Sequence, residues 1–114
     1  MESSYQHCLA REFSLSNVPF REQVPVPVRY KGVDVDCRYR ADFVVDEHLL
    51  VEIKSVEHVP AIAEAQMITY LRLLGLQQGL LINFNVKRLV DGVRRFVNTG
   101  RPSAAALDTD TVHT

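Results

Sequence analysis

Three charged residues, Asp42, Glu52 and Lys54, lie in two neighbouring stretches whose composition is typical of β-strands. Side chains alternate between the faces of a strand, so Glu52 and Lys54 share one face. If the two stretches form a hairpin symmetric about Glu47, Asp42 lies opposite Glu52 with a Cβ separation of about 5 Å. Carboxylates that close repel each other, so the arrangement needs either a cation between them or a proton on one of them.

A hard divalent ion would relieve this repulsion and supply hydrolytic chemistry. Mg²⁺ prefers oxygen ligands and is usually held by one or two carboxylates, a role that suits Asp42 and Glu52 together with the backbone carbonyl of Ile53. The ammonium group of Lys54 can orient a nucleophile or stabilise negative charge on a phosphorane-like transition state. The trio predicts metal-dependent phosphodiester cleavage. The spacing alone is equally compatible with a solvated strand face in which Asp42 is a chance neighbour.

A helix predicted over residues 61–74 adds two polar candidates. Gln66 and Tyr70 are four positions apart, which puts an amide and a phenol on one helix face. Met67 and Leu71 already serve the core, so the polar pair favours a functional reading of the constellation.

The spacing of apolar residues predicts the elements that must position these side chains. We expect a helix through residues 5–13, strands over 20–30, 33–45 and 49–56, a helix over 61–74, a buried strand over 79–84, and a closing helix marked by Leu89, Val93, Phe96 and Val97. Pro25 and Pro27 cannot donate to a neighbouring strand, so the first strand should lie at a sheet edge. The sequence predicts an α/β fold of order αβββαβα, with a mixed sheet of about four strands flanked by helices.

The strand over residues 33–45 is expected to have a polar and an apolar face. The polar face would carry Asp36, Arg38, Arg40, Asp42 and Val44, and the apolar face Cys37, Tyr39, Ala41, Phe43 and Val45. Arg38 and Arg40 are candidates for contact with nucleic-acid phosphates; the alternative is that they screen the nearby carboxylates. Lys and Arg residues also cluster near the last predicted helix. They can be interpreted either as a patch that binds nucleic-acid phosphates or as a solvated helix face.

Composition limits the class of protein. At 114 residues and 46% hydrophobic content the chain can build one core, which we place in residues 1–98. Residues 99–114 are nearly devoid of large apolar side chains, so we expect a flexible tail. A net charge of -1 excludes a general nucleic-acid coat. The sequence has no apolar run long enough to span a membrane and no signal-peptide pattern, which predicts a cytoplasmic location.

Four stretches together resemble the bacterial GxxExxY proteins, a branch of the PD-(D/E)xK nuclease superfamily. They are Tyr39-Arg40-Ala41-Asp42, Val51-Glu52-Ile53-Lys54-Ser55, Glu64-Ala65-Gln66-Met67-Ile68-Thr69-Tyr70-Leu71 and Gly79-Leu80-Leu81-Ile82-Asn83-Phe84-Asn85. The resemblance spans roughly residues 1–98 and implies a restriction-endonuclease-like core that hydrolyses DNA or RNA, with DNA favoured, using Mg²⁺ or Mn²⁺.

The resemblance also implies a role for each residue. Asp42 and Glu52 would be metal ligands and Lys54 the catalytic base or stabiliser. Gln66 and Tyr70 match the Gln-x₃-Tyr helix motif, whose side chains support the active site or contact the nucleic acid.

The first helix departs from the pattern of this family. Glu2-Ser3-Ser4-Tyr5 matches the Glu-x-x-Tyr end of the family signature, but the preceding Gly is missing because the chain begins at Met1. Glu2 is the candidate for a first-helix acid that reaches toward the metal. Helix ends without a cap are mobile, so the sequence leaves open whether Glu2 completes the site.

The sequence leaves competing functions. The first is the metal-dependent nuclease. The second is a nucleic-acid-binding or assembly module that keeps the nuclease fold without catalysis. A homodimer through residues 24–30 or through the last helix is compatible with either, because one small domain offers little surface to hold a duplex.

Overall fold

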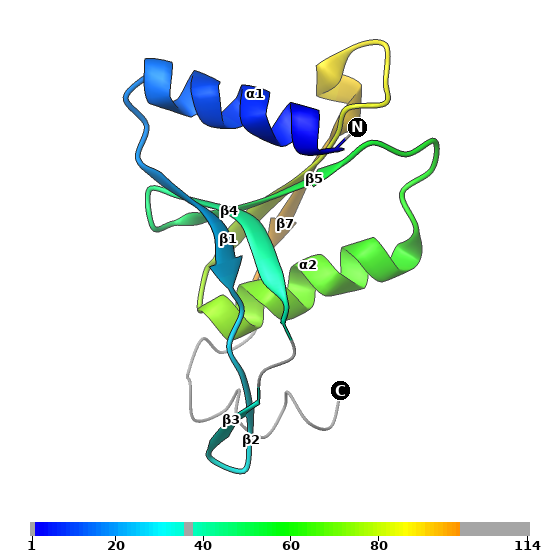
Figure 1. Ribbon diagram of the computed structural model, residues 1–114. Helices are drawn as coiled ribbons and strands as arrows, with labels where there is room; N and C mark the ends of the chain where they lie inside the picture. The colour runs from blue at the N-terminus through cyan, green and yellow to red at the C-terminus, as the bar shows by residue number, and fades with distance from the viewer. Residues whose placement is uncertain (1, 36–37, 99–114) are drawn as a thin grey trace.

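The computed structural model describes residues 2–35 and 38–98 (Figure 1). The predicted flexible tail over residues 99–114 lies outside these residues, as do the faces expected for Asp36 and Cys37.

The described residues form two α-helices, one 3₁₀ helix and seven strands. In chain order they are α1 (Glu2–Leu15), β1 (Phe20–Pro25), β2 (Val28–Tyr30), β3 (Val33–Val35), β4 (Arg40–Val45), β5 (Leu49–Lys54), α2 (Ala61–Leu74), β6 (Gln78–Asn83), η1 (Leu89–Gly92) and β7 (Val93–Val97). Five strands make one sheet in the order β1-β4-β5-β6-β7, and β2 and β3 pair separately. Among the described residues, no helix is long and apolar enough to cross a membrane.

The antiparallel pair β4 and β5 forms the hairpin that carries the charged constellation. Phe43 pairs with Val51 and Val45 with Leu49, so the register is symmetric about Glu47 as the sequence predicts. β5 and β6 run parallel and are joined through α2, whereas the other pairs in this sheet are antiparallel. The sheet is therefore mixed, and β1 lies at its edge as expected.

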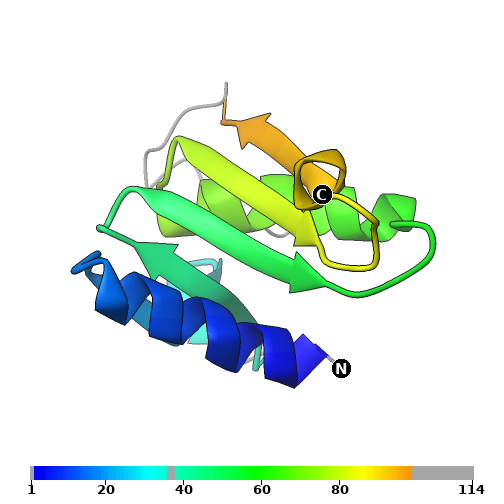
Figure 2. The same cartoon turned by 90° about the horizontal axis from the view of Figure 1, so that it is seen from above.

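A helix covers each face of the five-stranded sheet (Figure 2). α1 packs Leu9 and Phe13 in the cluster that contains Phe43, and α2 packs Met67 in the cluster that contains Leu50. Burying each large apolar side chain stabilises the fold by about 1.5–3 kcal/mol. The helices predicted over residues 5–13 and 61–74 are confirmed, and α2 ends where the sequence predicts, at Gly75 with a left-handed φ of 69°.

The predicted closing helix is wrong. Leu89–Gly92 forms the 3₁₀ helix η1, and Val93–Val97 forms β7, which pairs antiparallel with β6. The apolar spacing suits a helix, but the segment is also rich in β-branched and aromatic residues, and pairing with it satisfies backbone groups of β6 that would otherwise form a sheet edge. The sheet consequently has five strands rather than about four, and a dimer contact through a last helix loses its basis.

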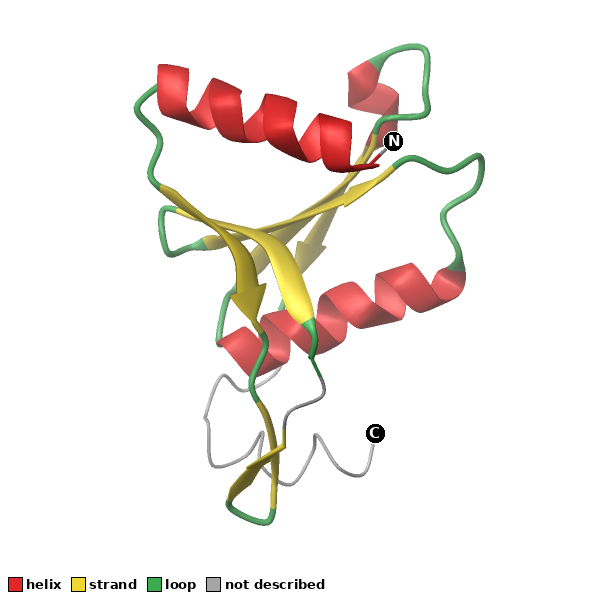
Figure 3. Ribbon diagram, in the orientation of Figure 1, coloured by secondary structure: helices red, strands yellow, loops and turns green. Residues whose placement is uncertain are grey.

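The two long strands predicted around Lys31 and Gly32 are each interrupted. β1 ends at Pro25, and β2 and β3 form a short hairpin beyond the main sheet (Figure 3). Arg38 has a left-handed φ of 59° and precedes β4. Because strand alternation does not extend from Asp42 back to Arg38, the prediction that these residues share a strand face is wrong.

The faces of β4 do not divide into polar and apolar as predicted. Val44 is buried in the cluster under α2, although it was expected on the polar face with Asp42. Ala41 packs in that same cluster, apart from Phe43 and Val45, which pack under α1. Since helices cover both faces of the sheet, the Asp42 region adjoins a packed surface rather than an open one.

Candidate active site

Two hydrogen bonds between a backbone N–H and a carboxyl group cross from one strand to the other at the point where β4 and β5 separate, and one of them joins Asp42 to Glu52. The last ladder pair is Phe43 with Val51. Beyond it, the backbone N–H of Asp42 donates to Oε2 of Glu52 at 2.6 Å, and the backbone N–H of Ile53 donates to Oδ2 of Asp42 at 2.7 Å. Each carboxyl group thus accepts a backbone hydrogen bond from the opposite strand, in place of a backbone carbonyl. The structure brings together the two acids that the register predicts to be opposite.

Burial makes this pair of acids electrostatically unusual. Glu52 is only 7% exposed, and desolvation, reinforced by the charge of Asp42, raises its pKa from the ordinary 4.5 to about 8. Desolvation also raises the pKa of Asp42, although the hydrogen bond from Ile53 opposes the shift. A proton on Glu52 therefore relieves the repulsion near neutral pH when no cation is bound.

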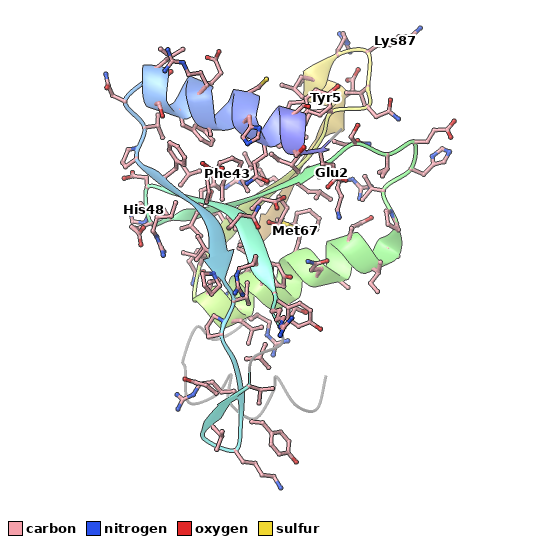
Figure 4. The ribbon with its side chains drawn as sticks, viewed as in Figure 1. Glu2, Tyr5, Phe43, His48, Met67 and Lys87 are labelled. Carbon is pink, nitrogen blue, oxygen red and sulfur yellow. The ribbon has the colours of Figure 1, made fainter. Side chains whose placement is uncertain are left out.

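Two further charges act on the pair from different elements. Lys54, half-buried at the end of β5, lowers the pKa of both acids, and Glu2, at the start of α1, raises both. Figure 4 shows Glu2 beside Tyr5 at the N-terminal end of α1. In the described part of the chain, no group of three or more His, Cys, Asp or Glu side chains is close enough to hold a metal ion. Glu2 therefore influences the pair without completing a three-residue ligand set.

The ends of β5 and β6 are tied together next to Lys54. The backbone N–H of Phe84 donates to the carbonyl of Lys54 at 2.8 Å, and the side chain of Asn83 bonds both the N–H and the carbonyl of Val56. The ring of Phe84 stacks on that of Tyr5 with 4.5 Å between centroids. These contacts fix the backbone that carries Lys54 and hold the first turn of α1 over the same region.

α2 contributes Tyr70 and Gln66 from the other side of the sheet. Tyr70 is buried, and desolvation raises the pKa of its phenol, a shift that the charges of Glu52 and Asp42 increase. Gln66 hydrogen-bonds to Tyr70 and opposes the shift. The structure thus brings the predicted amide–phenol pair within electrostatic range of the two acids.

Gln23 is a neighbour of Asp42 that the sequence interpretation missed. The β1–β4 register places it opposite Asp42, and its side chain hydrogen-bonds to the Asp42 carboxyl group. Gln23 has a left-handed φ of 49°, and it also donates to Oε1 of Gln6 in α1 at 3.0 Å. In the sequence, the signal for Gln23 is the register between the strand predicted from residue 20 and the one that ends at residue 45. A glutamine on an edge strand gives no other indication of a functional role.

Arg38 precedes β4, whereas Arg40 is the first residue of that strand. Both are exposed, and Nη1 of Arg40 donates to the carbonyl of Tyr39 at 3.0 Å. Their predicted contact with nucleic acid is compatible with the fold, although for Arg38 it does not follow from a strand face shared with Asp42.

Comparison with known protein families matches residues 1–96 to the PD-(D/E)XK nuclease superfamily. The chain belongs to this superfamily. Members typically use divalent metals, which agrees with the paired carboxyl groups at the separation of β4 and β5. The match reaches the superfamily and does not resolve the GxxExxY branch within it.

The solved structures give an independent view of the fold. The crystal structure of SSO0001 is similar to this PD-(D/E)XK chain with a TM-score of 0.64 and 17% sequence identity. The similarity covers 98% of this chain and 58% of that one, so the chain spans somewhat more than half of that structure. At this identity the likeness shows the fold alone. No curated protein matches the chain.

Proposed function

We propose that this protein is a metal-dependent nuclease that hydrolyses phosphodiester bonds, with DNA as the favoured substrate. The observation that carries the proposal is the buried Asp42–Glu52 pair, held by crossed hydrogen bonds in a superfamily of nucleases. A raised pKa at a buried carboxyl group with a defined charge partner is characteristic of functional sites. A purely structural role would not require two acids to face each other where two strands separate.

The donor set suits Mg²⁺ or Mn²⁺. The crossed hydrogen bonds engage Oε2 of Glu52 and Oδ2 of Asp42, and the backbone carbonyl of Ile53 lies in the same short stretch. Hard divalent ions of this kind take oxygen ligands from one or two carboxylates and fill the remaining positions with water and substrate phosphate. Such an ion, when bound, neutralises the charge that builds up on the phosphoryl oxygens.

The other residues of the site have roles that follow from their charges and positions. Lys54 presents a cation beside the acids, where it orients the attacking water or stabilises the transition state. Tyr70 and Gln66 support the acids from α2 and can donate hydrogen bonds to the nucleic acid. Glu2 adds negative charge from α1, which strengthens the attraction for a cation. Arg38 and Arg40 are proposed to contact phosphates.

Within the superfamily we place the chain in the GxxExxY branch. Support comes from Glu2 and Tyr5, whose spacing matches the Glu-x-x-Tyr end of the signature. Both residues lie in the first turns of α1, where Tyr5 stacks on Phe84 and Glu2 acts on the acids. A first helix placed in this way gives the signature residues a direct connection to the site.

A cleavage assay tests the proposal. Purified protein with Mg²⁺ or Mn²⁺ should cut one or more of single-stranded DNA, duplex DNA and RNA, and Lys54→Ala should abolish cutting. Lys87→Ala is the matched control, because Lys87 is exposed in the loop after β6 and should leave the rate unchanged (Figure 4). Equal behaviour of the wild type and Lys54→Ala on all three substrates would show that the catalytic role is wrong.

One observation favours a second candidate, a nuclease-fold module that binds nucleic acid without cutting it. With its pKa near 8, Glu52 can relieve the conflict with Asp42 by keeping a proton, so the fold does not require a cation. A module of this kind binds nucleic acid in the presence of a chelator and with strong salt dependence. Calorimetric titration with Mn²⁺ separates the candidates, since heat that is lost in Asp42→Asn identifies the metal site.

A further inference from the structure

The β2–β3 hairpin extends away from the main sheet beyond the ends of β1 and β4 (Figures 1 and 3). Each of its strands has three residues, and they pair only with each other. An isolated two-stranded hairpin is at best marginally stable in water. Its apolar side chains Tyr30, Val33 and Val35 are exposed and are not buried in the domain core. A hairpin of this kind is suited to contact with a binding partner.

Aromatic rings and cations alternate along this projection. Tyr30 is 43% exposed, and Nζ of the adjacent Lys31 lies 5.3 Å from the centroid of its ring. Tyr39 is 50% exposed and lies between Arg38 and Arg40. Exposed rings with neighbouring cations are the pattern by which proteins bind unpaired nucleic-acid strands, in which the bases stack on the rings and the cations track the phosphates.

Tyr39 connects the projection to the active site. Its carbonyl accepts a hydrogen bond from the N–H of Val26 at 3.0 Å, and the buried side chain of Val26 anchors this crossing to the domain. The ring of Tyr39 lies 6.2 Å from that of Tyr70. Tyr70 in turn feels the charges of Glu52 and Asp42, so Tyr39 lies on the side of the domain from which α2 reaches the acids.

The local charge agrees with a polyanionic partner. Residues 29–40 contain four Lys or Arg and two Asp, whereas the whole chain has a net charge of -1. Arg29 is paired with Asp34 at 3.1 Å, so the positive charge next to the rings comes mainly from Lys31 and Arg40. A positively charged segment in an otherwise acidic chain concentrates nucleic acid at this end of the molecule.

We infer that the β2–β3 hairpin and Tyr39 form a binding site for an unpaired nucleic-acid strand, which they lead toward Asp42 and Glu52. Bases in a duplex already stack on one another, so the rings of Tyr30 and Tyr39 select a strand whose bases are free. The inference rests on the proposed nuclease function and narrows its substrate to single-stranded DNA or RNA, or to a single-stranded extension of a duplex.

Binding measured without metal tests this inference separately from cleavage. The full chain is titrated in EDTA into a fluorescently labelled oligothymidylate of roughly 12 nucleotides, with a blunt duplex for comparison. Tyr30→Ala and Tyr39→Ala should each weaken binding of the single strand by roughly 5- to 150-fold, because base–aromatic stacking contributes about 1–3 kcal/mol per base. Tyr30→Phe and Tyr39→Phe keep the rings and should bind like the wild type. Leu89→Ala, a change at an exposed apolar residue on η1, is the control.

The outcomes distinguish the two proposals. Tyrosine-dependent binding in a protein that never cuts would leave this inference standing and refute the nuclease. Cleavage with single-strand binding unchanged in both alanine variants would refute this inference and leave the nuclease. Tighter binding of the blunt duplex than of the single strand would also overturn it. If Tyr30→Ala loses self-association but keeps nucleic-acid binding, the inference is also overturned, because the hairpin is then a protein interface.

Discussion

Replacing Glu52 with Gln should stabilise the metal-free protein at neutral and alkaline pH. In the folded state the pKa of Glu52 is about 8, against 4.5 as its ordinary value. The folded protein therefore binds more protons than the unfolded chain between these values, and its stability falls as pH rises through this window. Gln is neutral at every pH, and its side-chain oxygen can still accept the hydrogen bond from the N–H of Asp42.

The size of this effect follows from the shift in pKa. Each pH unit in which Glu52 is protonated when folded and ionised when unfolded changes the free energy of unfolding by about 1.36 kcal/mol. Between about pH 5.5 and pH 8 the wild type should lose about 3 kcal/mol through this group, and Glu52→Gln should not lose it. In a domain of this size that corresponds to a separation of melting temperatures of more than about 10 °C at pH 8.

Thermal unfolding in EDTA over this pH range measures the difference directly. The two proteins should melt within a few degrees of each other near pH 5.5 and diverge as pH rises, with the Gln variant the more stable. Excess Mn²⁺ at pH 8 should raise the melting temperature of the wild type and leave that of the variant nearly unchanged. If the curves stay parallel, or if the variant is less stable at pH 8, Glu52 is not held in the protonated, buried state described above.

Two other substitutions test the elements around the site. Phe43→Ala removes a fully buried ring that contacts Phe13 and Phe20, so urea denaturation should show a loss of about 3–5 kcal/mol; a loss below about 1 kcal/mol would mean that α1 does not pack here. Gln23→Ala removes a hydrogen bond that lowers the pKa of Asp42, so an NMR titration should show a higher pKa for that carboxyl group, and an unchanged value would show that Gln23 does not position it.

The sequence predicted the hairpin and its acids because their positions depend on local rules. Alternation and a short polar turn are sufficient to set the β4–β5 register, and that register places Asp42 opposite Glu52. The bounds of α2 follow from good helix formers and from Gly75, which adopts the left-handed conformation that ends the helix. These features require no knowledge of distant contacts.

The errors arose where distant contacts decide the outcome. The spacing of Val93, Phe96 and Val97 suits a helix and a strand alike, and the free edge of β6 selects the strand. Gln23 could be recognised only after β1 was aligned with β4. Burial of Glu52 was likewise invisible, since alternation assigns a residue to a face but does not say that a helix covers it.

A crystal soaked with Mn²⁺ at about pH 8, where deprotonation of Glu52 favours binding, tests the central claim most directly. The account predicts an anomalous-density peak at the separation of β4 and β5, within about 2.5 Å of oxygens from Asp42, Glu52 and the Ile53 carbonyl, and no peak there in Asp42→Asn. A wild-type crystal with ordered Asp42 and Glu52 side chains and no peak between them would contradict it.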